Sequence, residues 1–392
     1  MRLVTLTNLY PSQDQPRRGI FVEERLRQLV RTGELSAAVL GLRPGVAGFA
    51  GAGPVRTELR HSIPVEYVTV PTLPLLTNWV DPWLWARRAE RFVRARLEPN
   101  AKDVVLDGHF LYPDGAAAVL IGIRLGLPTV LTARGSDVNV KCNNLVMRQW
   151  VKFAARNCSA LITVSRALAA RLTELRISAP VIEVLPNGVD FDRFRPVDRP
   201  TIRARLGVDG HVVASVGHLV PEKGHDIAIR ALVELPGTTL LVVGEGPEKA
   251  RLQSLADRLG VAARLRLLGH VAHEQMPEVY SAADALVLAS VREGMPNVVL
   301  ESLACGTRVV ATDVGGVSEI VTSPALGLLM RERSPAALVE SLKRLIAEPI
   351  DSESTRAMAR RFGWATVVER QIALYRRVLA THASVQRTQG DH

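Results

Sequence analysis

Two glutamates stand eight residues apart in the stretch REGMPNVVLE. Glu293 lies in a loop-like segment with Gly294 and Pro296, and Glu301 lies inside a helix predicted from VVLESLACG. Ionised carboxylates only accept hydrogen bonds and therefore suit sugar hydroxyls, whereas the unpaired N–H groups at a helix start suit a phosphate. Together these groups fit a nucleotide sugar. The alternative interpretation is that Glu293 only favours the helix dipole and Glu301 is an ordinary surface residue.

Three further segments at predicted strand ends carry residues suited to the same ligand. In GHLVPEKG (217–224), Gly217 lets a ligand approach the backbone and Lys223 supplies a cation for phosphate. GEGP (244–247) and LLGHV (267–271) follow two other apolar runs. GHLVPEKG is not a Walker A loop because it lacks Gly-Lys-Ser/Thr, and GEGP lacks the third glycine of the dinucleotide fingerprint.

Short apolar runs alternate with amphipathic helical segments along most of the chain, which predicts parallel sheets covered by helices on both faces. In such sheets, ligands bind at the carboxyl ends of the strands. The pattern breaks at 185–200, where an Asn-Gly pair and three prolines indicate a connector between two α/β domains that flank a cleft. The clearest strand-like runs are 2–7, 103–108, 129–133, 160–165, 211–217, 239–246, 263–271, 284–290 and 308–316.

Composition narrows the class of protein. The 392 residues contain no run near the roughly 20 apolar residues of a membrane span and no apolar N-terminal stretch long enough for a signal peptide, so we expect a cytoplasmic protein. The three scattered cysteines suit buried thiols in a reducing compartment. Residues 1–196 hold 26 basic and 17 acidic residues and so carry +9 of the net charge of +10, which suggests an anionic partner for this half.

A family resemblance follows from these motifs. The stretch ASVREGMPNVVLESLACGTRVVATDVGGVSEIV resembles the donor-site signature of the retaining glycosyltransferases of family 4, and GHLVPEKG, GEGP and LPNGVD resemble three more motifs of that family in the same order. NLYPSQDQPRRGIFVEERLRQL, DGHFLYPDG and TARGSDVN extend the resemblance into the N-terminal half. It therefore covers nearly the whole chain, and the N-terminal stretch is most similar to bacterial exopolysaccharide, capsule and teichuronic-acid-type enzymes.

The resemblance implies the GT-B fold, an α/β architecture of two Rossmann-like doubly wound domains facing across a cleft. Residues 1–190 would form the acceptor-binding domain, and a C-terminal helix at about 366–382 would pack back on it. Residues 191–365 would form the nucleotide-sugar-binding domain. The tail at 383–392 is expected to be disordered.

The resemblance also implies roles for individual residues. Glu301 would bind the nucleotide ribose, Glu293 the hydroxyls of the transferred sugar, and Lys223 the diphosphate. His218 stands where most relatives carry a diphosphate-binding arginine, and histidine, unlike arginine, loses its charge across the physiological pH range. The other implied donor-site positions are Gly19 in a loop that closes over the phosphates, Gly217, Gly244, Val271 beside the base, and Gly294, Met295, Pro296 and Asn297 against the donor.

Three residues of the N-terminal half are candidates for the reaction centre. His109 matches the acceptor-domain histidine that lies near the donor sugar in the family, which completes a catalytic set with Glu293 and Lys223; the alternative is a structural histidine. Arg134 and Asp137 in TARGSDVN occupy the next strand end, where many relatives carry His-Gly-x-Asp, and they are candidates for the acceptor side. Because Arg134 stands where those relatives have a histidine, its role stays open. The alternative for Asp137 is that it only caps a turn.

No metal or other cofactor is expected. The sequence DFD at 190–192 matches the Asp-x-Asp of metal-dependent transferases of a different fold, but it directly follows PNGV in the connector and fits turn chemistry. Lys223 and helix ends can carry the charge of the leaving group instead.

The basic half has a helical pattern of its own. In 82–97, Arg87, Arg88, Arg91 and Arg94 lie mostly opposite an apolar face, and basic residues recur at i, i+4 and i+8 in 144–157. This pattern fits either a solvated face or docking on anionic lipid. No recognised nucleic-acid motif accompanies it.

The predicted function is transfer of a sugar from a nucleoside diphosphate to a glycan or lipid-linked acceptor, by a hexosyltransferase at the inner face of the cell membrane. The alternatives are a nucleotide-sugar epimerase on the same fold and a non-catalytic sugar-binding module. The base, the sugar and the acceptor do not follow from the sequence.

Overall fold

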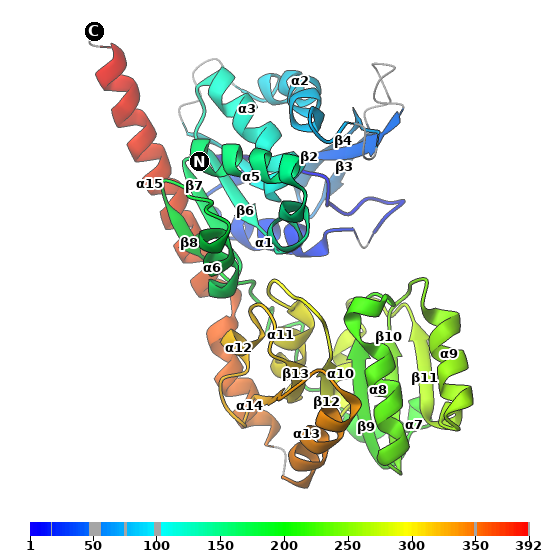
Figure 1. Cartoon of the computed structure of the whole chain (residues 1–392). Coiled ribbons are helices and arrows are strands. Elements are labelled where there is room, and N and C mark those ends of the chain that lie inside the picture. Colours follow the sequence, from blue (N-terminus) through cyan, green and yellow to red (C-terminus); the bar gives the residue numbers. More distant parts are fainter. Residues whose placement is uncertain (17, 47–55, 74–76, 98–102, 349–350, 391–392) are drawn as a thin grey trace. The chain divides into compact units, whose positions relative to one another are not determined.

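The computed structural model describes residues 1–16, 18–46, 56–73, 77–97, 103–348 and 351–390. The chain divides into two compact units (Figure 1). Unit 1 comprises Met1–Asn187 and Val367–His392, and unit 2 comprises Gly188–Thr366. The division falls close to the boundaries expected at 190 and 365.

Unit 1 contains an eight-stranded sheet with the order β3-β4-β2-β1-β5-β6-β7-β8. All neighbours are parallel except β3 and β4, which pair antiparallel at one edge. The strand order reverses between β1 and β5, which is where ligands bind in open α/β sheets. The strands are β1 (Arg2–Thr7), β2 (Ser36–Gly45), β3 (Arg56–Arg60), β4 (Ile63–Pro71), β5 (Val104–His109), β6 (Thr129–Ala133), β7 (Ala160–Thr163) and β8 (Ile182–Val184).

Unit 2 contains a six-stranded, wholly parallel sheet with the order β11-β10-β9-β12-β13-β14. This is the doubly wound order of nucleotide-binding domains, and it reverses between β9 and β12. The strands are β9 (His211–Val216), β10 (Thr238–Val243), β11 (Leu265–Gly269), β12 (Ala285–Leu288), β13 (Val309–Thr312) and β14 (Gly327–Met330).

The central strands are buried on both faces. Every residue of β5, β6 and β12 is buried, and successive side chains of a strand point to opposite faces. Both faces must therefore be covered by helices, as the continuous apolar runs predict. The helices of unit 1 are α1 (Ile20–Arg31), α2 (Asp81–Arg94), α3 (Ala116–Leu125), α4 (Ser136–Asn139), α5 (Leu145–Asn157) and α6 (Arg166–Glu174). Those of unit 2 are α7 (Arg199–Leu206), α8 (His225–Ala231), α9 (Lys249–Arg258), α10 (Met276–Ala282), α11 (Asn297–Ala304), α12 (Val317–Ile320), α13 (Pro335–Ala347) and α14 (Ser352–Ala359).

The last helix, α15 (Trp364–Gly390), begins in unit 2, and its residues from Val367 onward belong to unit 1. It lies alongside β8 (Figure 1), where Arg370 Nη2 is 2.7 Å from Glu183 Oε1. The helix continues through Gly390, so residues 383–390 are helical where the sequence predicts a disordered tail. The prediction failed because a segment without an apolar stripe can still extend a helix whose earlier turns are anchored by packing.

Candidate active site

The carboxyl ends of β9 and β12 meet where the strand order of unit 2 reverses. Lys223 ends the short helix η4 (Pro221–Lys223) after β9, and Glu293 lies in the loop between β12 and α11. Lys223 Nζ is 2.7 Å from Glu293 Oε1, and the Ser290 hydroxyl donates to the same oxygen at 2.7 Å. The side chains are 30% and 11% exposed, respectively. The predicted phosphate-binding cation and the predicted sugar-binding carboxylate therefore form one ion pair at the expected edge of the sheet.

A glycine turn after β13 holds the loop that carries Glu293. Gly315 has a φ of 56°, and a Cβ at this position would lie 2.0 Å from the carbonyl oxygen of Glu293. The N–H of Gly316 donates to the carbonyl of Gly294 at 2.9 Å. Only glycine fits this turn, which fixes the backbone at the predicted donor-contacting residues. The remaining predicted residues of the segment lie at the start of α11: Met295, Pro296 and Asn297.

Glu301 lies in α11, and each of its carboxylate oxygens has a protein partner. Tyr280 OH donates to Oε2 at 2.6 Å, and His273 Nε2 is 3.1 Å from Oε1. Arg193 Nη1 lies 3.0 Å from His273 Nδ1; because a guanidinium only donates, Nδ1 accepts and Nε2 carries the proton given to Glu301. Burial, and then the Glu301 charge, raise the pKa of Tyr280 well above its usual value, so the phenol stays protonated.

These partners fix the orientation of the carboxylate. A carboxylate has about four acceptor positions, so Glu301 keeps capacity for two hydroxyls of a ligand. His273 and Tyr280 were not predicted from the sequence. His273 lies two residues beyond the motif LLGHV, but Tyr280 has no local signal.

The loops after β9 and β10 touch through two glycines. Gly244 has a φ of 142°, and a Cβ there would lie 1.8 Å from the carbonyl oxygen of Gly217. Both predicted glycines thus permit a close approach of backbone to backbone. His218 is exposed directly after Gly217.

Val271, the residue predicted to border the base, lines a cavity of about 390 Å³ in unit 2. The cavity combines apolar side chains with an amide and two charged groups, which is the composition of a small-molecule site. Its other lining residues are Arg205, Leu206, Leu268, Gln275, Glu278 and Val279.

In unit 1, Gly19 is the residue before α1, in the loop that follows β1. It has a φ of 76°, and a Cβ at this position would lie 2.1 Å from the carbonyl oxygen of Leu9. Gly19 therefore closes this loop tightly on itself.

His109 ends β5, and its imidazole is completely buried. Arg134 Nη2 lies 2.9 Å from its Nδ1, and its Nε2 lies 2.9 Å from Asp107 Oδ2. Because Arg134 only donates, Nδ1 accepts. The ring proton is therefore on Nε2, which donates to the Asp107 carboxylate. Burial lowers the pKa of His109, although the Asp107 carboxylate acts in the opposite direction. Both ring nitrogens of the predicted catalytic histidine are therefore engaged by protein groups, with the ring neutral.

The acceptor-side candidates lie in the same cluster. Arg134 also donates from Nη1 to Asn187 Oδ1 at 2.9 Å. The buried Asp137 carboxylate accepts the backbone N–H groups of Leu111, Arg134 and Gly135. Asp137 thus holds the turn between β6 and α4, in agreement with the capping alternative.

A buried chain of hydrogen bonds joins α15 to this cluster. Tyr375 OH lies 3.3 Å from Asp107 Oδ1 and accepts from Gln371 Nε2 at 2.6 Å. Arg25 Nη1 donates to Gln371 Oε1 at 2.9 Å. Tyr375, Gln371 and Arg25 were not predicted from the sequence, since they lie far from His109 along the chain.

Solved structures share this architecture. A sucrose-phosphate synthase from Thermosynechococcus elongatus has a TM-score of 0.79 at 19% identity, over 97% of this chain and 99% of that one. Anabaena HepE in complex with UDP and glucose has a TM-score of 0.74 at 22% identity, over 95% and 98%. These similarities establish the fold.

Sequence comparisons establish the family. Residues 22–193 match Glycosyltransferase Family 4, and residues 198–362 match Glycosyl transferases group 1. The putative teichuronic acid biosynthesis glycosyltransferase TuaC of Bacillus subtilis is 32% identical over 89% of this chain and 90% of its own length. This chain belongs to the GT-B glycosyltransferases. The predicted GT-B fold and membership of the glycosyltransferases are therefore confirmed.

A second group of relatives matches half of the glycosyltransferase. A D-inositol 3-phosphate glycosyltransferase of Mycobacterium tuberculosis is 37% identical over 223 residues, which is 53% of this chain and 46% of the relative.

The DFD stretch of the glycosyltransferase forms a turn. Asp190 Oδ1 accepts the backbone N–H of Asp192 at 3.0 Å and that of Arg193 at 3.2 Å. This is the turn chemistry predicted for DFD. Among the residues that the structure describes, no group of three or more His, Cys, Asp or Glu side chains could hold a metal ion.

The basic helices of the glycosyltransferase carry exposed apolar side chains beside their arginines. Arg87, Arg91 and Arg94 are exposed on α2, whereas Arg88 is half-buried, with guanidinium nitrogens in the interior. Arg88 therefore does not share the exposed face with the other three arginines of α2. Within the described ranges, no helix has the length and apolar character needed to cross a membrane.

Proposed function

We propose that this glycosyltransferase moves a sugar, with retention of configuration and without a metal, from a nucleoside diphosphate to a glycan or lipid-linked acceptor in bacterial cell-surface polysaccharide synthesis. The observation that carries the proposal is the Lys223–Glu293 pair at the point where the strand order of unit 2 reverses. The relation to TuaC supports the polysaccharide class, and the HepE complex with UDP and glucose supports a nucleotide-sugar donor.

The geometry suggests that Glu301, Lys223 and Glu293 each bind a different part of the donor. Glu301, oriented by Tyr280 and His273, binds the ribose hydroxyls. An ammonium group has three donors, so Lys223 can keep Glu293 and still bind the diphosphate, whose charge grows as the sugar–phosphate bond breaks. Glu293, held by Lys223, binds hydroxyls of the transferred sugar.

His109 has a supporting role in this proposal. Its two nitrogens are already bonded to Arg134 and Asp107, so it has no proton to give to a substrate without losing one of these contacts. We infer that the neutral ring keeps Arg134 and Asp107 in position in unit 1 and is not a proton donor in the reaction.

Thermal-shift measurements with UDP, GDP and ADP and their sugars test the donor class. A ligand at 100 times its Kd adds about 2.7 kcal/mol of stability, which is readily measured. The nucleotide that raises the melting temperature of wild type should lose this effect in Glu301→Ala, because its ribose would no longer be bound. No shift with any nucleotide would refute the proposed function.

The reaction type is tested with the identified donor. NMR should show the donor's anomeric configuration kept in the product, and inversion would refute retention. Activity should survive EDTA; full loss that Mg²⁺ or Mn²⁺ restores would refute metal independence. An epimerase would instead release a new nucleotide sugar without any acceptor, so incubation without acceptor separates these two enzymes.

We also propose that unit 1 docks on the inner face of the cell membrane. Trp79 just before α2 and Trp83 in its first turn are 65% and 41% exposed, and Leu145 and Val146 at the start of α5 are 69% and 43% exposed. Trp150 Nε1 donates to the carbonyl of Trp79 at 2.9 Å, which joins α5 to the segment before α2. Tryptophans beside basic residues suit a membrane interface with anionic lipids.

A further inference from the structure

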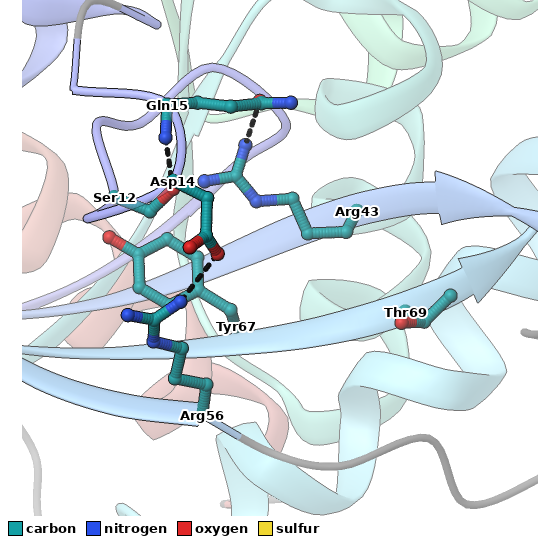
Figure 2. A pocket seen from close by; sticks show the side chains of 7 residues that line it. All are labelled: Ser12, Asp14, Gln15, Arg43, Arg56, Tyr67 and Thr69. Carbon is teal, nitrogen blue, oxygen red and sulfur yellow. Dashed lines mark hydrogen bonds and ion pairs between the residues drawn. The ribbon is translucent and has the colours of Figure 1, made fainter.

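A polar cavity of about 220 Å³ lies in unit 1 (Figure 2). It opens where β2 and β4 end, beside the loop that follows β1. The carboxyl ends of parallel strands are the usual place for ligands in such a sheet. The lining residues are Ser12, Asp14, Gln15, Arg43, Arg56, Tyr67 and Thr69.

Arg43 is held rigidly at this cavity. Its Nη1 donates to Gln15 Oε1 at 3.1 Å, its Nη2 donates to the carbonyl of Tyr10 at 3.0 Å, and its guanidinium lies 4.8 Å from the centre of the Tyr67 ring. All three partners are uncharged, so these contacts orient the cation without neutralising it. A preorganised guanidinium of this kind suits a carboxylate or a phosphate.

A neighbouring arginine adds to the positive charge. Arg18 Nη1 donates to the same Gln15 Oε1 at 3.2 Å, so one amide oxygen receives two guanidinium groups. Burial, and next the charge of Arg18, lower the pKa of Arg43. An added anion would favour the charged form of Arg43 and so oppose both effects.

Arg56 shows how a carboxylate fits here. It forms an ion pair with Asp14, which reaches in from the loop and is 76% exposed, and its Nε lies 3.1 Å from Glu58 Oε1. Figure 2 shows Asp14 and Arg56 facing each other beside the Tyr67 ring. An exposed carboxylate gains little from such a pair, so a ligand anion can replace it at low cost.

The remaining lining groups suit a sugar. Ser12, Thr69 and Gln15 offer hydroxyl and amide groups. Burial raises the pKa of Tyr67 to about 12, so its phenol stays neutral and donates to the carbonyl of Pro11. The cavity has room for roughly seven water molecules, which limits the occupant to about one sugar ring.

We propose that this cavity binds an anionic sugar of the acceptor, through a carboxylate or phosphate group held by Arg43 and Arg56. The inference rests on the proposed function, because it assigns the acceptor to unit 1. It predicts an acidic acceptor glycan, and it places the acidic sugar outside the Lys223–Glu293 site.

Binding of small probes to the full chain tests the proposal without any transfer reaction. Glucuronate, glucose and inorganic phosphate are titrated separately while protein NMR signals are followed. We expect saturable glucuronate binding with a Kd on the order of 1 mM and at least about tenfold weaker glucose binding. Competition by phosphate identifies a phosphate-bearing sugar as the natural ligand, and glucuronate binding that phosphate does not displace identifies a uronic acid.

The matched variants are Arg43→Gln and, as control, Arg171→Gln in α6, where the arginine side chain is 39% exposed. Glucuronate or phosphate binding should weaken at least about tenfold in Arg43→Gln and stay unchanged in the control. Arg56→Gln is the second test should Arg43→Gln fail to fold. Equal binding of glucose and glucuronate, no binding up to about 20 mM, or binding that survives both cavity variants would overturn the proposal.

Binding of UDP, GDP and ADP to the same proteins tests the proposed acceptor subsite separately from the proposed transferase function. A cavity variant that loses glucuronate but keeps nucleotide binding supports the acceptor subsite. A wild-type protein that binds glucuronate but no nucleotide would refute the proposed function and leave an acidic-sugar site.

Discussion

Lys223 Nζ lies 2.7 Å from Glu293 Oε1, so two residues with separate predicted roles neutralise each other before any ligand is bound. The pair has a physical consequence. A carboxylate without Lys223 would be left largely buried beside Ser290, and an ammonium group without Glu293 would lose its fixed position. The two residues should therefore behave as a coupled unit.

Replacement of Glu293 by alanine should lower kcat by at least about a hundredfold, because it removes a contact to the sugar in the transition state and releases Lys223. Donor binding should weaken less. Steady-state kinetics and nucleotide-sugar titrations of the variant measure the two effects. Glu340→Ala, at an exposed position of α13, is the control and should match wild type. Near-normal kcat in Glu293→Ala would remove Glu293 from the site.

Replacement of Glu301 by alanine should act chiefly on donor affinity, and calorimetric titration with the nucleotide measures it. We expect a Kd at least about tenfold higher, as for loss of a charged hydrogen-bond acceptor. Tyr280→Phe removes one orienting contact but keeps the carboxylate, so its effect should be smaller. An unchanged Kd in Glu301→Ala would refute the ribose assignment.

Stability of unit 2 should fall in mild acid because of His225. Its ring is buried, with Nδ1 2.8 Å from Ser215 Oγ, and burial lowers its pKa to about 4. In the unfolded chain this histidine takes up its proton near pH 6.5. The contribution of His225 to the free energy of unfolding is therefore complete above that pH and is lost as the pH falls toward 4. Between pH 7 and pH 5 the loss should be about 2 kcal/mol.

Urea unfolding of unit 2 at the two pH values measures this loss. His225→Asn should reduce the difference between them, while His270→Asn, at an exposed histidine, should not. Equal pH dependence in wild type and His225→Asn would contradict the assignment.

Tyr375→Phe should lower kcat by about tenfold with little change in donor KM, because Asp107 loses a hydrogen bond and its hold on His109 loosens. Tyr375 is a positioning residue, since it acts only through Asp107. Leu374→Val, at a buried apolar position of the same helix, controls for lost stability. If both variants lose kcat equally, α15 stabilises the fold without tuning the site.

Membrane docking should depend on the exposed arginines of α2. Arg87→Gln with Arg91→Gln should weaken binding to anionic vesicles by roughly 30-fold at low salt, at about 1 kcal/mol for each charge. Vesicle sedimentation measures binding, and donor hydrolysis should be unchanged. Arg230→Gln with Arg258→Gln removes two exposed charges from unit 2 as control. If wild type does not bind such vesicles, the basic face is only solvated.

Local patterns predicted much of the fold. The runs at 2–7 and 129–133 coincide with β1 and β6, because strands buried on both faces are continuous apolar runs. The strands β2, β3 and β4 are not among the clearest runs. β3, with the sequence RTELR, is a polar antiparallel edge strand without a buried residue, so it leaves no apolar signal.

The candidate site could likewise be predicted only as far as its residues lie in local motifs. Glu293, Glu301 and Lys223 lie in local motifs and could be predicted from them. Their orientation could not, because Tyr280 and His273 approach Glu301 through tertiary packing alone. The polar cavity of unit 1 was missed for the same reason: Asp14, Arg43 and Arg56 lie on three separate segments.

The return of α15 to unit 1 has a consequence for biosynthesis. Tyr375 contacts Asp107 across 268 residues of sequence, whereas unit 2 is one continuous segment. As the chain leaves the ribosome, unit 2 is complete before the residues that bond to Asp107 and Arg25 have been synthesised. The domain that is translated first is therefore the last to be finished, and a truncated chain would carry a buried carboxylate with one partner missing.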